Sequence, residues 1–296
     1  MGSGSYTSAD WAKLRSSAKI TERSNDRDIF KKREMDQRFD PKYINVREAR
    51  DGDDHPESTP IIIGLDVTGS MGYLAAQIAK EGLNETMMKL FSTKPVTDPQ
   101  IMLAALGDVV DSAPLQVTQF ESDIRIAEQL MDLWLEGRGG DSPEDYNLLW
   151  YFAAKHTSTD CFEKRGKKGY IFTIGDADCH RSITGDSLRK VFGEKEDELT
   201  LKQTAEMAKE KYELFHIHIS NHRDDRPSLL GSVIPGRIIT VEKAYVDTIP
   251  ELIVGALLLA GGQNMKQVVS NWPEHSELVQ RSLSGLVMNN SGSIVF

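Results

Sequence analysis

The sequence predicts an α/β fold, a three-layer sandwich in which helices cover both faces of a mostly parallel central sheet. Short apolar runs rich in β-branched residues recur along the chain, as in residues 61–65 (Ile-Ile-Ile-Gly-Leu). Such runs are typical of strands that are buried on both faces. Segments with apolar residues at helical spacing separate most of these runs, and this alternation favours parallel pairing through right-handed crossovers.

Six runs are predicted as strands, and the third of them is shorter than the second. They cover residues 61–65, 101–106, 116–120, 170–174, 214–219 and 237–241.

Helices are expected between the strands and after the last one. The segments are 71–91, 124–135, a helix from Pro143 through Phe152, 182–192, 201–212 and 249–260. Pro143 suits the first turn of its helix, because proline lacks an N–H that would be unsatisfied there. The glycine-rich residues 137–140 separate that helix from the preceding one.

The chain divides into a central domain and two extensions. Residues 57–262 carry the α/β pattern. Residues 1–56 form a charged N-terminal extension, expected as one or two surface helices across the domain or as a partner-binding arm. Residues 263–296 form a C-terminal extension that packs on the domain or docks a partner.

Composition limits the function classes. The formal net charge of −10 argues against nucleic acid or anionic membrane as a partner, because either needs a basic face. The longest apolar run, residues 252–260, is too short to span a membrane, and no secretory signal is visible. We expect a cytoplasmic protein in which Cys161 and Cys179 are reduced.

Polar side chains follow the predicted strands at three places. Asp66, Thr68 and Ser70 come after the first strand, Asp141 lies in the loop before Pro143, and Asp176 follows the strand at 170–174. Because ligands of such sheets bind outside the carboxyl ends of the strands, these loops are expected to converge. The alternative for Thr68 and Ser70 is that they only cap the following helix.

This set of carboxylates and hydroxyls predicts a metal site. An all-oxygen site suits Mg²⁺, with Mn²⁺ or Ca²⁺ as alternatives, and is poor for zinc. Weak ligation by hydroxyls and water leaves positive charge on the ion and an open position. A carboxylate of another molecule can fill that position.

Residues 62–72 (Ile-Ile-Gly-Leu-Asp-Val-Thr-Gly-Ser-Met-Gly) resemble the first motif of the von Willebrand factor type A (vWA) family, which has a Rossmann-like fold. The metal-ion-dependent adhesion site (MIDAS) of that family uses Asp-x-Ser/Thr-x-Ser, a Thr on a second loop and an Asp on a third. Asp66, Thr68 and Ser70 match the first motif and Asp176 the third.

The second motif departs from the family, because Asp141 or Ser142 follows the Gly-Gly pair where a Thr is usual. The resemblance therefore implies a variant MIDAS. The loops at 139–144 and 176–180 also resemble those of vWA domains associated with α-kinases.

The resemblance implies a divalent-cation-dependent protein–protein interaction module that binds an acidic residue of its partner. Intracellular bacterial proteins of this kind often work with AAA+ ATPases as adaptors, which makes such an ATPase a candidate partner. No catalytic or cofactor-binding residue is assigned, and no enzyme activity is expected. A metal-free interaction scaffold and a metal-dependent phosphoester hydrolase remain alternatives.

Three further sets of polar residues are candidates for supporting or structural roles. Asp108 follows a predicted strand and is a candidate supporting group, whereas Asp178 is interpreted as a loop-capping residue. His216 and His218 share one face of a strand, and they are interpreted as structural rather than as zinc ligands.

Overall fold

The computed structural model describes residues 6–21, 23–69, 71–78, 82–137, 143–221 and 226–288. Three residues that the sequence predicts as candidate metal ligands lie outside these described residues: Ser70, Asp141 and Ser142.

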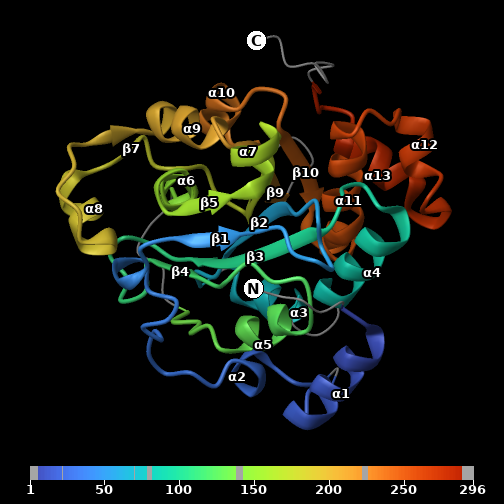
Figure 1. The fold of residues 1–296 in the computed structure, drawn as a ribbon, viewed down its shortest axis with the longest axis horizontal. Coiled ribbons are helices and arrows are strands. Elements are labelled where there is room, and N and C mark those ends of the chain that lie inside the picture. Colours follow the sequence, from blue (N-terminus) through green and yellow to red (C-terminus); the bar gives the residue numbers. More distant parts are fainter. Residues whose placement is uncertain are drawn as a thin grey trace.

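Six strands of the described chain form one central sheet, in the spatial order β10-β9-β6-β2-β3-β4 (Figure 1). They are β2 (Thr59–Asp66), β3 (Pro99–Leu106), β4 (Leu115–Val117), β6 (Gly169–Gly175), β9 (Tyr212–Ser220) and β10 (Ile238–Glu242). The sheet is parallel except for β4, which pairs antiparallel with β3 at the edge. The predicted fold class, an α/β sandwich with a mostly parallel sheet, is confirmed.

The strand order places a topological switch point between two neighbouring strands. Numbered along the chain, the six strands run 3-2-1-4-5-6 across the sheet, which is the doubly wound order. The connections diverge between β2 and β6, where Leu65 pairs with Ile174. A crevice outside the carboxyl ends of these two strands is the expected ligand position.

The alternation of side chains along β2 builds two hydrophobic cores, one on each face of the sheet. Ile61, Ile63 and Leu65 belong to one buried cluster, and Ile62 belongs to the other. Gly64 faces the second cluster, where a Cβ atom would overlap with Leu149.

The first face is covered by helices that carry the first cluster. These are α3 (Gly72–Gln77), α4 (Leu83–Thr93), α5 (Arg125–Met131) and α11 (Ile249–Ala260). The second face is covered by α6 (Tyr146–Lys155), α8 (Gly185–Phe192) and α9 (Leu201–Lys209), which lie above the sheet in Figure 1.

Some predicted helix bounds differ from the structure. The segment 71–91 contains two helices, α3 and α4. The segment 182–192 begins with a short strand, β7 (Ser182–Ile183), which pairs with β8 (Leu199–Thr200). Helix α8 starts only at Gly185, because the Thr184 hydroxyl accepts a hydrogen bond from the Ser187 backbone and so caps the helix there.

The N-terminal segment packs on both faces, because Trp11 and Phe30 belong to the first cluster whereas Ile44 and Ala49 belong to the second. It contains α1 (Ser8–Ala18), α2 (Asp26–Ile29), the short helix η1 (Pro41–Tyr43) and β1 (Arg47–Ala49), and β1 pairs with β5 (Thr157–Thr159). Trp11 and Phe30 are buried in the first cluster. These helices are therefore anchored by large apolar side chains rather than resting on the surface by polar contacts alone.

The C-terminal segment extends the wall beyond α11. Helices α12 (Met265–Val269) and α13 (Ser276–Leu283), joined by η4 (Pro273–His275), contact α11. Val268 and Leu283 are fully buried in the first cluster. Three further short helices complete the described chain: α7 (Asp160–Arg165), α10 (Ser228–Val233) and η3 (Lys243–Thr248).

Among the described residues, no helix has the length and apolar character needed to cross a membrane. Cys161 and Cys179 are both buried free thiols.

Candidate functional site

Asp66 ends β2 at the switch point and is almost completely buried. Its Oδ1 accepts hydrogen bonds from the Thr68 backbone N–H at 2.9 Å and from the Thr68 hydroxyl at 2.7 Å. A turn follows, in which the Met71 N–H donates to the Thr68 carbonyl, and it leads into α3. The first strand thus delivers a carboxylate and a hydroxyl to one point.

Tyr146, in the first turn of α6, contacts the other side of this carboxylate. Its hydroxyl donates to Asp66 Oδ2 at 3.3 Å. Gly175, the last residue of β6, makes room for this contact, because a Cβ atom there would overlap the Tyr146 hydroxyl and lie 2.9 Å from Asp66 Oδ2. Glycine at this position is required by the close approach of the phenol.

Glu144 brings a second buried carboxylate to the site from the second loop. Its Oε1 lies 3.3 Å from the Thr68 hydroxyl oxygen. Its backbone N–H donates to the Asp178 carbonyl at 2.8 Å, and its carbonyl accepts from the His180 N–H at 3.0 Å. These two backbone bonds fix the second loop against the third.

Burial without a counter-charge dominates the electrostatics of these carboxyls. Burial raises the pKa of Asp66 to about 6, and the charge of Asp176 adds to this effect, while hydrogen bonds from Thr68 oppose it. Burial also raises the pKa of Glu144 to about 9, with further contributions from Asp66 and Asp108. A cation between these groups would relieve the repulsion.

Asp108 follows β3 and is buried beside Glu144, close enough to raise the pKa of that carboxyl. The loop that carries it is a tight turn, because the Asp108 N–H donates to Asp111 Oδ2 and the Asp111 N–H donates to the Asp108 carbonyl. Asp145 Oδ2 accepts from the Val109 N–H at 2.8 Å and ties this turn to the start of α6. The structure thus places Asp108 near the site.

Asp176 follows β6 directly and is partly exposed. Its charge acts on Asp66 and on the Tyr73 phenol of α3. The structure therefore brings Asp66, Thr68 and Asp176 to one edge of the sheet. It does not place Ser70 or Asp141, which lie outside the described residues.

Asp178 has a structural role. Its carboxylate accepts hydrogen bonds from the N–H groups of Leu229 (2.7 Å) and Leu230 (3.0 Å) in the first turn of α10. The residue thus caps a helix and closes the third loop, in agreement with its interpretation as a capping residue.

His216 forms a neutral wall behind the site. His216 Nδ1 lies 2.9 Å from the Thr173 hydroxyl, and the His216 ring packs 4.9 Å from the Tyr146 ring, centroid to centroid. Burial lowers the pKa of His216 to about 3, so this ring is uncharged at neutral pH. It supports Tyr146 rather than offering a charge.

The donor set fits a hard divalent cation. The donors near Asp66 are carboxylate and hydroxyl oxygens, which Mg²⁺, Mn²⁺ and Ca²⁺ prefer. Within the described ranges, no three His, Cys, Asp or Glu side chains form a group that could hold a metal ion. Thr68 adds a neutral oxygen to this donor set.

Glu144 is the site residue that sequence reasoning missed as a candidate ligand. It was visible in the second loop, directly after Pro143. The signal that could have found it is its place two residues before Tyr146, in the loop that the sequence already directed toward Asp66.

No protein-family description matches this sequence, and no curated protein matches it. Solved structures are similar in part. The pilus adhesin SpaC from Lactobacillus rhamnosus GG, in its open conformation, is 8% identical with a TM-score of 0.45 over 72% of this chain and 31% of that chain.

Two other solved structures are similar over nearly the same part of the chain. Proximal thread matrix protein 1 from the mussel byssus, with a zinc-occupied MIDAS motif, is 12% identical with a TM-score of 0.41 over 73% of this chain and 49% of that chain. A von Willebrand factor type A protein from Catenulispora acidiphila is 14% identical with a TM-score of 0.42 over 70% and 44%. This chain spans less than half the length of each of the three, and these likenesses assign no family.

Proposed function

We propose that this chain is a divalent-cation-dependent protein-interaction module whose bound ion ligates an acidic residue of a partner protein. One observation carries the proposal. Asp66 and Thr68 are hydrogen-bonded to each other at the switch point of the sheet, with the buried carboxyl of Glu144 against the Thr68 hydroxyl. Buried carboxyls gathered at a ligand-binding edge favour a cation.

The proposed ligands come from all three loops. Asp66 and Thr68 supply the first-loop oxygens together with Ser70, Asp141 is the second-loop candidate from the sequence, and Asp176 serves the third loop. Mg²⁺ is the proposed ion, with Mn²⁺ and Ca²⁺ as alternatives. When bound, the ion supplies the positive charge and the open coordination position that a partner carboxylate occupies.

Hydrogen bonds within the chain orient the proposed donor groups at this edge. Tyr146 and the Thr68 backbone orient the Asp66 carboxylate, and the two backbone bonds of Glu144 hold the second and third loops together. Oriented donors lose little conformational entropy when a ligand binds, which favours affinity.

The partner class follows from the same chemistry. An exposed Asp or Glu of a protein is the proposed ligand, and we propose a cytoplasmic adaptor role without catalysis. An AAA+ ATPase is the partner that the vWA resemblance implies.

Isothermal titration with MgCl₂, MnCl₂ and CaCl₂ tests the ion. The wild-type chain is expected to bind one ion, and Asp66→Asn, which keeps the shape and removes the charge, is expected to weaken binding by more than about ten-fold. Asp186→Asn is the matched control, because the Asp186 side chain is 90% exposed and lies on α8. Absence of binding to the folded wild-type chain would support a metal-free scaffold instead.

Partner recognition is tested with a synthetic peptide that carries a central Glu, and with its Gln counterpart. The Glu peptide is expected to bind only with the ion present, and EDTA is expected to abolish binding. Turnover of p-nitrophenyl phosphate by wild type but not by Asp66→Asn would contradict the interaction role and favour the hydrolase.

A further inference from the structure

A pocket of about 590 Å³ lies between the N-terminal segment and the region around α5. Its size is in the range of small-ligand sites. No lining residue belongs to the candidate functional site. The lining residues that matter are Arg38, Phe39, Tyr43, Val46, Arg47 and Arg125.

Arg47, the first residue of β1, is only 6% exposed. Its Nη2 donates to the carbonyls of Arg38 and Val117, the latter at 3.0 Å. Its Nε is buried without a hydrogen-bond partner, and no carboxylate of the described chain forms an ion pair with it. Burial lowers the pKa of Arg47 to about 10, so the group stays cationic at neutral pH.

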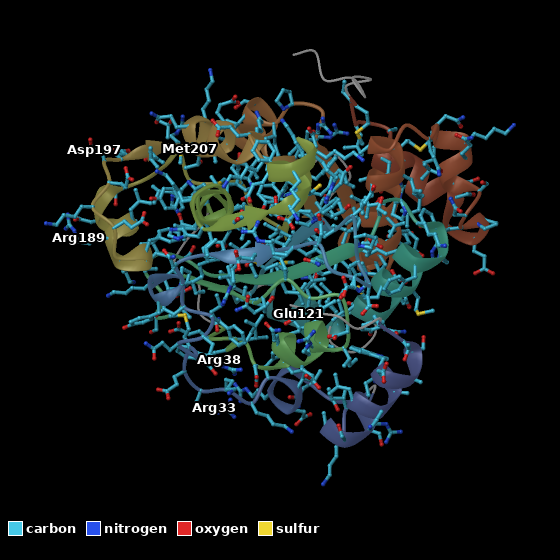
Figure 2. The ribbon with its side chains drawn as sticks, in the orientation of Figure 1. Arg33, Arg38, Glu121, Arg189, Asp197 and Met207 are labelled. Atoms are coloured by element: carbon cyan, nitrogen blue, oxygen red, sulfur yellow. The ribbon has the colours of Figure 1, made fainter. Side chains whose placement is uncertain are left out.

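The other two arginines of this pocket are neutralised. Arg38 pairs with Asp36 at 2.7 Å and with Asp132 at 3.1 Å. Arg125 pairs with Asp123 at 2.9 Å and with Glu121 at 3.0 Å. Figure 2 shows Arg38 and Glu121 on the α5 side of the central sheet.

Arg47 therefore differs from its neighbours in carrying a buried charge that only backbone carbonyls solvate. A buried cation without an anion is unfavourable. An anion in the pocket can accept a charge-assisted N–H bond from the part of the guanidinium that the two carbonyls leave free.

Exposed apolar side chains also line the pocket. Tyr43 is 60% exposed and Val46 is 38% exposed, and both line this pocket. Phe39 and Ile44 are buried beside them. The pocket thus combines an uncompensated cation with an exposed aromatic surface, which suits a ligand with an anionic group and an apolar body.

We infer that this pocket binds an oxyanion, carboxylate or phosphate, attached to a small apolar body. Arg47 pairs with the anion and Tyr43 contacts the body. The inference is independent of the proposed cation-dependent function, because the two sites share no residue.

Titration of ¹⁵N-labelled protein, followed through backbone amide shifts, tests the inference with four probes. Benzoate and phenyl phosphate are expected to bind and to shift amides of residues 37–47 and 119–132. Benzamide, the neutral isostere of benzoate, is expected to bind more weakly by about ten-fold or more. Inorganic phosphate separates recognition of the anion alone from recognition of the apolar body. The ratio of benzoate to phenyl phosphate affinity tells which oxyanion the pocket prefers.

Variants assign the roles. Arg47→Lys keeps the charge but removes the guanidinium N–H groups that the carbonyls hold in place, and it is expected to weaken benzoate binding by about ten-fold. Tyr43→Ala, at an exposed position, is expected to weaken benzoate while leaving inorganic phosphate unchanged. Arg189→Gln is the matched control, since Arg189 is exposed on α8, does not line the pocket and pairs with Asp186.

Equal binding of benzoate and benzamide would overturn the inference. So would benzoate shifts located elsewhere, or a folded Arg47→Lys protein with unchanged affinity. Arg47 would then be only a tie between the segment at Arg38 and strand β4. If Arg47→Lys fails to fold, the location of the benzoate shifts and the Tyr43→Ala affinity decide the question.

Discussion

The Glu144 carboxylate lies 3.3 Å from the Thr68 hydroxyl, although the two residues are 76 positions apart in the chain. This contact joins the second loop to the first directly above the buried carboxyl of Asp66. It places a second buried carboxyl group beside Asp66, and it gives a direct way to probe the site's electrostatics.

Glu144→Gln is expected to separate the charge of this residue from its shape. Because the pKa of Glu144 is raised to about 9, its carboxyl is protonated at pH 7 in the ion-free protein, and Gln replaces it with a neutral group of similar size. The free energy of unfolding without metal should change by less than about 0.5 kcal/mol. The stabilisation produced by MgCl₂ should fall clearly, and urea unfolding with and without MgCl₂ measures both. A full Mg²⁺ response in Glu144→Gln would show that the carboxylate does not face the ion.

Gly175→Ala is expected to disturb the orientation of Asp66. The new Cβ overlaps the Tyr146 hydroxyl, so the phenol has to move and its hydrogen bond to Asp66 Oδ2 is lost. The expected destabilisation is about 1–3 kcal/mol, together with a weaker response to Mg²⁺. Gly231→Ala is the matched control, since a Cβ there meets no atom within 4 Å. Equal Mg²⁺ responses of the two variants would contradict this role for Tyr146.

Asp178→Ala is expected to loosen α10 without touching the proposed ligands. The carboxylate satisfies two backbone N–H groups of the first turn of that helix, and removing it costs about 1–2 kcal/mol. Hydrogen exchange should speed up at Leu229 and Leu230 more than in α9. Unchanged exchange at these amides would show that the cap is dispensable.

Asp51 is expected to give the protein an acid-sensitive stabilisation. Hydrogen bonds from Arg165, and then from Ser58, hold the pKa of this carboxyl well below its ordinary value of 3.8. A carboxyl whose pKa is lower in the folded protein stabilises the fold above the ordinary pKa, and this contribution is lost as the pH falls through the folded-state pKa.

Asp51→Asn should therefore be less stable than wild type by about 1–3 kcal/mol at pH 7, and the difference should shrink below about pH 4. Urea unfolding across pH 3–7 measures the difference. Asp186→Asn, at an exposed position, serves as the control. A difference that stays constant down to pH 3 would contradict the ionic role of Asp51.

The sheet was predictable because its strands are buried on both faces. Residues 61–65 and 170–174 are mostly apolar because they lie between two layers of helices, so they read as nearly continuous runs. Their structural counterparts, β2 and β6, extend them by one or two residues at each end. Short elements such as β1 were missed, because three residues with mixed burial carry no period.

The site was predictable only where it follows a strand directly. Asp66 and Asp176 are placed by the ends of β2 and β6, which the apolar runs mark. Glu144 is placed by backbone hydrogen bonds to residues 178 and 180, and Tyr146 by the space left at Gly175. Such contacts between distant loops leave no local pattern in a single sequence.

The third loop also connects the edge that carries Asp66 and Thr68 to a helix of the second face. Asp178 is bound to Glu144 through its carbonyl and to α10 through its carboxylate. A partner that displaces Asp176 would therefore also displace Asp178 and, through its carboxylate, helix α10. Under the proposed function, partner binding at one edge would thus change a surface that the partner does not contact, and a second protein could recognise that change.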